Sequence, residues 1–104
     1  MAMRQHHYRI SVDHLKTPKG APVVLEPLVF AARNHDDLFA IVERARGKTG
    51  LGADDAAALI IGLKLLAEIA LENRDNPLFV DLREPLRDFI VKLKRAPALM
   101  TPAC

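Results

Sequence analysis

The chain has 104 residues, of which 50% are hydrophobic and 27% are charged, a composition typical of a single globular domain. Its 15 basic and 13 acidic residues leave a net charge of +2 and alternate in sign, which argues against a concentrated basic face for nucleic acid. Cys104 is the only cysteine, which excludes an internal disulfide, and the N-terminal residues MAMRQHHYR lack the apolar core of a signal peptide, so we expect a cytoplasmic location.

The first elements that the sequence predicts are two strands. Apolar and polar side chains alternate over residues 6–15, which is typical of a half-buried strand. Residues 16–22, KTPKGAP, are rich in proline, glycine and lysine and predict the turn of a hairpin. Residues 23–32 predict the second strand, in which Pro27 has no amide hydrogen and therefore indicates an edge strand or a bulge.

A first helix is predicted to follow, with Asn34 as its N-cap and Asp36 and Asp37 in its first turn. Apolar residues recur at helical spacing along it, and Gly47 stands in the position that ends a helix. The residues of this apolar stripe are Leu38, Ile41, Val42 and Ala45.

The central helix is predicted to begin at Asp54 and Asp55 and is apolar on nearly all sides over residues 56–71. This run is too short and too interrupted by Lys64 and Glu68 to span a membrane. We expect the helix to be the buried centre of the fold, and Gly62 to mark the close approach of another backbone. The residues expected to be enclosed are Leu59, Leu63, Leu66 and Ile69 or Ala70.

The last helix is predicted to begin with Asn76 as N-cap and Pro77 at its first position, with a break near Pro85. Its apolar stripe consists of Phe79, Leu82, Leu86, Phe89, Ile90 and Leu93. The predicted fold is α+β: an N-terminal antiparallel β-hairpin packed on a three-helix bundle with a central buried helix. The domain covers residues 6–95, with flexible residues 1–5 before it and a flexible tail, residues 96–104, after it.

No motif in the sequence predicts a catalytic, cofactor or metal site. The histidines lack the converging spacing of zinc ligands, and the Gly-Lys-Thr tripeptide at residues 47–49 follows a helix and lacks the earlier glycine of a phosphate-binding loop. Paired aspartates at helix starts are explained by capping. Cys104 has no helix N-terminus or cationic pocket near it in sequence, so a solvated thiol is the better interpretation.

Five residues are candidates for a ligand site or an interface, and two of them are the only charges on the central apolar run. A partly buried Lys64 would have altered reactivity and would point to a pocket. The simpler interpretation, which we favour at this point, is a Lys64–Glu68 pair four residues apart that faces water. The candidates are His35, Asp36, Asp37, Lys64 and Glu68.

Four segments of the chain have a recognisable pattern: HHYRISV, LVFAARNHDDLFAIVERARG, GLKLLAEIALENRDNPLF and DFIVKLK. In these segments the chain resembles an uncharacterised family of small bacterial proteins catalogued as a domain of unknown function (family 3861). The resemblance covers residues 6–95 and implies a cytoplasmic single-domain α+β protein. It implies no activity, cofactor or substrate.

Three functions are therefore compared. The leading hypothesis is a non-enzymatic interaction module that forms a homodimer or binds another protein, because one hairpin and two helices cover only part of the apolar central helix. The first alternative is a small-molecule-binding protein or minor enzyme with a pocket between hairpin and helices. The second is weak nucleic-acid binding through lysines near residues 16–19 and 92–95, which the lack of a stacking platform disfavours.

Overall fold

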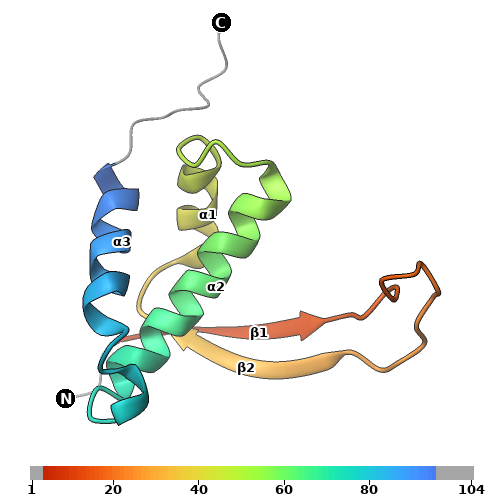
Figure 1. Ribbon diagram of the computed structural model, residues 1–104, viewed down its shortest axis with the longest axis horizontal. Helices are drawn as coiled ribbons and strands as arrows, with labels where there is room; N and C mark the ends of the chain where they lie inside the picture. The colour runs from red at the N-terminus through yellow and green to blue at the C-terminus, as the bar shows by residue number, and fades with distance from the viewer. Residues whose placement is uncertain (1–3, 96–104) are drawn as a thin grey trace, which may run out of the picture.

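The computed structural model describes residues 4–95 and confirms the α+β architecture, with an antiparallel hairpin followed by helices (Figure 1). The elements are β1 (His6–Val12), β2 (Leu28–Asn34), α1 (Leu38–Arg46), α2 (Ala53–Glu72), the 3-10 helix η1 (Pro77–Phe79) and α3 (Arg83–Arg95). The predicted tail with Cys104, and residues 1–3, lie outside the described residues.

The hairpin pairs without interruption from His6 opposite Asn34 to Val12 opposite Leu28. The predicted second strand was placed too early, because β2 begins directly after Pro27 rather than containing it, and so no bulge is needed. Since proline cannot donate to a ladder, it sits just outside the paired region. Residues 16–22 form the predicted turn, where Lys16 bridges to Pro22.

One face of the hairpin is apolar beyond its first pair, His6 and Asn34. Tyr8 pairs with Ala32, Ile10 with Phe30 and Val12 with Leu28, and because cross-strand partners share a face, these side chains point the same way. Exposure rises along this face with distance from the helices: Tyr8, Ile10 and Ala32 are half-buried, while Phe30, Val12 and Leu28 are 42%, 50% and 64% exposed. Figure 1 shows the hairpin projecting beyond the helices, and we call its outer part, residues 10–30, the hairpin arm.

The core lies mainly between α1 and α2. Leu38 and Ala45 from the predicted stripe of α1 are buried. Ala56 and Ile60 of α2 are buried as well, both with no exposed surface. The N-cap prediction for α1 was wrong. Asp37 caps the helix, accepting hydrogen bonds from the amides of residues 39 and 40, whereas Asn34 is the last residue of β2.

The central helix α2 is buried on one side only. Leu63 and Ala70 are buried as predicted, but Leu66 is 40% exposed and Ile69 is 47% exposed, so their predicted enclosure was wrong, and Leu59 is only half-buried. Because α2 is apolar around most of its circumference, its sequence does not indicate which side packs against α1 and β2.

The predicted close approach at Gly62 was also wrong, since no atom lies within 4 Å of the position that a Cβ would occupy. Gly62 is exposed within a regular helix, where alanine is favoured by about 1 kcal/mol. We therefore expect Gly62→Ala to raise the free energy of unfolding by up to about 1 kcal/mol, measured by urea denaturation. A destabilised variant would contradict this and would indicate a neighbour in an assembly.

The C-terminal helical segment is divided in two, as Pro85 suggested. Asn76 caps η1 by accepting from the amide of Leu78, which confirms that cap. The α-helix α3 then begins at Arg83, which places Pro85 in its first turn, where a missing amide hydrogen is tolerated. Among the described residues α3 has no fully buried side chain, and its apolar stripe is half-covered.

Candidate functional site

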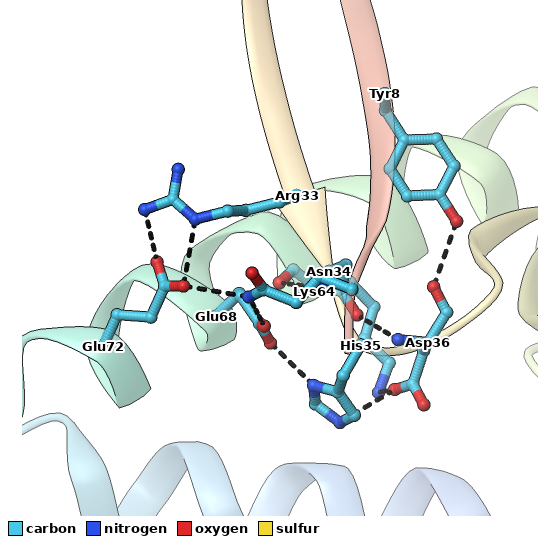
Figure 2. A network of polar contacts seen from close by, with 9 residues as sticks. Tyr8, Arg33, Asn34, His35, Asp36, Lys64, Glu68 and Glu72 are labelled. Carbon is cyan, nitrogen blue, oxygen red and sulfur yellow. Dashed lines mark hydrogen bonds and ion pairs between the residues drawn. The ribbon is translucent and has the colours of Figure 1, made fainter. Parts of the chain in front are cut away.

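Four of the five candidate residues meet where the hairpin joins the helices (Figure 2). His35 and Asp36 lie in the connection after β2, and Lys64 and Glu68 project from successive turns of α2. We call these four residues the root network. The fifth candidate, Asp37, does not join it, because its carboxylate caps α1.

Glu68 is the most buried member of the network, with a side chain that is 2% exposed. One carboxylate oxygen lies 2.8 Å from Nδ1 of His35, and the other accepts a hydrogen bond of 2.7 Å from Nε2 of Gln5. A carboxylate removed from water needs such partners on both oxygens to offset the cost of burial. Glu68 thereby ties the chain before β1 and the chain after β2 to the same turn of α2.

Lys64 pairs with Asp36 rather than with Glu68. Its ammonium nitrogen lies 2.7 Å from Oδ2 of Asp36, and its side chain is only 13% exposed. The favoured interpretation of a Lys64–Glu68 pair facing water was therefore wrong. Both residues instead turn toward partners about 30 positions earlier in the chain.

The Lys64 pairing alters the titration of Asp36. Partial burial acts to raise the pKa of the Asp36 carboxyl, but the hydrogen bond and positive charge of Lys64 outweigh it, so that the pKa lies below its ordinary value. A carboxyl with a lowered native pKa adds stability above its unfolded value of about 3.9 and loses it as the pH falls through the native value.

We therefore expect Asp36→Asn to be less stable than the wild type near neutral pH and to lose less stability on acidification to about pH 3. Urea denaturation of both proteins at several pH values measures the two effects. Asp13→Asn is the control, since Asp13 forms no ion pair within residues 4–95. An Asp36→Asn variant with the full acid sensitivity of the wild type would show that Lys64 does not stabilise this carboxylate.

Two further residues, which sequence reasoning missed, fix the connection that carries His35 and Asp36. Asn34 is 1% exposed; its amide donates to the backbone carbonyl of Lys64 at 2.9 Å, and its Oδ1 accepts from the amide of Asp36 at 2.9 Å. The Tyr8 hydroxyl donates to the carbonyl of Asp36 and accepts from the amide of Leu38, both at 3.0 Å. The ends of β1 and β2 thus hold the start of α1 in place.

A further ion pair that sequence reasoning missed lies at the outer side of the junction. Arg33 contacts Glu72 through two hydrogen bonds of 2.9 and 3.0 Å, and Gln5 donates to the same carboxylate at 2.9 Å. The hydrogen bonds from Gln5 and Arg33 hold the pKa of Glu72 below its usual range. The spacing of Lys64, Glu68 and Glu72, each four residues apart on α2, is the signal that would have found it.

The polar contacts of this junction hold the hairpin onto α2. Each buried acid is matched by a donor, and within residues 4–95 no buried side-chain polar atom lacks a hydrogen-bond partner. The part of the chain that the structure describes also contains no group of three or more residues suited to hold a metal ion. None of the helices in residues 4–95 is both long and apolar enough to cross a membrane.

A cavity of about 470 Å³ adjoins the root network between α2 and α3. His35, Lys64 and Glu68 line one part of it, and Figure 2 shows the His35 ring on the side of the network that faces α3. Three of the five candidate residues therefore border an open space as well as anchoring the hairpin.

The hairpin and helices correspond to a known protein-family model. Residues 6–95, from the first residue of β1 to the last residue of α3, match the model of DUF3861, a domain of unknown function for which a structure has been solved. The chain belongs to the DUF3861 family. The resemblance seen in the sequence is thereby confirmed over the same residues, and the family domain coincides with the hairpin and the helices.

A solved structure supports the same assignment. A protein of unknown function from Pectobacterium atrosepticum, determined by crystallography at 2.20 Å, matches this chain with a TM-score of 0.74 and 31% sequence identity. The match covers 88% of this chain and 98% of that protein. No curated protein matches the chain. The DUF3861 fold is thus shared, and its function must be argued from the residues.

Proposed function

We propose that the protein is a cytoplasmic, non-enzymatic interaction module that self-associates through its hairpin arm. The observation that carries this proposal is the apolar face of the arm, which continues beyond the helices that cover its base. Side chains on one face of a strand that are buried near the helices and exposed farther out are typical of a surface completed by another molecule.

The size of the arm's apolar surface favours an interface. A two-stranded hairpin is marginal in water unless its apolar face rests on something. A standard interface takes roughly 800 Å² from each partner, and the apolar side chains that the arm exposes are the part of the hairpin that could supply such an area. The apolar residues of this face that are at least 42% exposed are Val12, Leu28 and Phe30. Val29 is exposed on the opposite face, and Leu15, Val24 and Leu25 are exposed in the segments next to the turn.

A second copy of the chain is the partner that fits this surface best. Within the described residues, β1 and β2 pair only with each other, so each strand leaves its outer edge open. Two identical arms related by a twofold axis bury the same apolar residues against each other, and twofold dimers are the commonest symmetric assembly. The pairing of strand edges adds backbone hydrogen bonds to this contact.

The root network, together with the Arg33–Glu72 pair beside it, supports this function by orienting the arm. Glu68 and Glu72 hold both ends of the hairpin through Gln5, His35 and Arg33, so the arm leaves the helices in a fixed direction. A binding surface that is already ordered loses less conformational entropy when it associates.

Sedimentation velocity over a range of micromolar concentrations tests the proposal. We expect the wild type to sediment as a dimer and Leu28→Asp to sediment as a monomer with an unchanged circular dichroism spectrum, because a buried carboxylate without a partner is costly. The matched control is Leu78→Asp in η1, where the leucine is 76% exposed and lies outside the arm.

The control variant should remain dimeric. A wild type that stays monomeric at the highest concentration contradicts self-association. Dimers that persist in Leu28→Asp as strongly as in Leu78→Asp would move the interface away from the arm.

A further inference from the structure

The cavity between α2 and α3 combines an apolar floor with a basic rim. Its apolar walls come from two helices that face each other at a distance that their side chains do not fill. The residues of these walls are Ala67, Ala70 and Leu71 on α2, and Leu86, Ile90 and Val91 on α3. Ala67 and Ala70 each contribute only a methyl group to the α2 wall.

Charge is strongly segregated in this cavity. Five basic residues line it, whereas Glu68 is the only acidic residue among the lining residues, and its carboxylate is already bonded to His35 and Gln5. The chain as a whole has nearly equal numbers of basic and acidic residues. The basic residues are Lys64, Arg74, Arg83, Arg87 and Lys94.

These cations are mostly without acidic partners. Of the five, only Lys64 forms an ion pair within residues 4–95, with Asp36. The acids of α3 lie elsewhere: Glu84 and Asp88 border a separate shallow hollow with Asp81. The helix therefore presents Arg83, Arg87 and Lys94 to the cavity, whereas neither of its acidic residues lines it.

We propose that this cavity binds a small amphipathic anion, in which a carboxylate or phosphate head is joined to an apolar chain. Arg87 is suited to hold the head, because a guanidinium group donates paired hydrogen bonds to such oxygens. Arg83 lies one turn before it on α3, and its guanidinium donates to the carbonyl of Arg74 at the same end of the cavity. The apolar chain then lies along the walls toward Lys94. A volume of about 470 Å³ is that of an ordinary small-molecule site.

This proposal is independent of self-association, since it rests on α2 and α3 rather than on the arm. A titration followed by amide chemical shifts tests it with four probes that separate head from chain: octanoate, octyl phosphate, octanol and inorganic phosphate. We expect octanoate or octyl phosphate to shift amides of α2 and α3 on both sides of the cavity, and to bind at least about tenfold more tightly than octanol or inorganic phosphate. Which of the two binds more tightly identifies the head.

Two variants remove the two halves of the site. Arg87→Gln should weaken binding of the tighter anion about tenfold, and Ala67→Phe should abolish it by filling the cavity. The control is Arg9→Gln, which removes the same charge from the hairpin, outside the cavity lining, and should change affinity by less than about twofold. The titration is repeated on Leu28→Asp, which should still bind the anion. This repeat separates loss of the dimer from loss of binding.

Several results would overturn the proposal. These are no amide shifts with either organic anion, equal binding of octanol and octanoate, or equal binding of inorganic phosphate and octyl phosphate. An Arg87→Gln variant that binds as tightly as Arg9→Gln would also overturn it, and this variant leaves the apolar walls intact should Ala67→Phe fail to fold.

Discussion

Replacing Ile60 with alanine should lower the free energy of unfolding by about 2–5 kcal/mol. Ile60 has no exposed surface and borders Ile41 and Ala45 of α1. Removing its side chain forfeits the burial of several methyl and methylene groups and leaves a cavity that close-packed neighbours fill only in part. Urea denaturation followed by circular dichroism measures the loss.

The matched control lies in the same helix. Leu66→Ala removes a side chain of similar size from a residue that is 40% exposed, so its cost in a monomer should be no more than about 1 kcal/mol. Equal losses in the two variants would mean that α2 is buried on both sides. Because an interface on α2 would make the Leu66 loss depend on protein concentration, the pair is measured at two concentrations.

Asn34→Ala should be the most destabilising polar substitution, with a loss of about 2–4 kcal/mol. The side chain is 1% exposed and makes two hydrogen bonds, to the carbonyl of Lys64 and from the amide of Asp36. Alanine leaves both backbone groups without this partner in a buried position, where each costs about 1–3 kcal/mol.

Asn76→Ala is the comparison, because Asn76 is an exposed cap of a short 3-10 helix. Its loss should be only about 0.5–1 kcal/mol. A ranking in which Asn76→Ala costs as much as Asn34→Ala would show that water reaches the junction and replaces the Asn34 hydrogen bonds.

The parts of the fold that sequence reasoning predicted are those with a local cause. Alternation over residues 6–15 indicated β1, which ends at Val12. The stripe from Leu38 to Ala45 indicated α1, and Asn76 with Pro77 indicated a helical start. The prediction failed where the apolar pattern was the same on both sides of an element. In α2, which is apolar on almost every side, periodicity does not distinguish the side that faces α1 from the side that carries Leu66.

Sequence reasoning named candidate residues but did not predict the contacts among them. His35, Asp36, Lys64 and Glu68 were named as candidates because two of them are the only charges on an apolar helix, but their mutual contacts were not predicted. The spacing within α2 suggests a pair only with the residue four positions away. The partners that Lys64 and Glu68 find in the connection after β2 are distant in sequence and leave no such signal. Asn34 was assigned as an N-cap because asparagine is favoured at that position. The same side chain also suits a buried strand end, because it bonds to backbone groups close by.

The N-terminal hairpin is secured only after most of the chain has been synthesised. Gln5 is 63 residues from Glu68 and 67 residues from Glu72, the carboxylates that its amide binds. At typical rates of translation, on the order of 3–13 s separate the synthesis of the hairpin's first residues from that of these partners. Throughout that interval the nascent hairpin has an apolar face and two open strand edges but no helices to rest on, and it is then most exposed to chaperones and to aggregation.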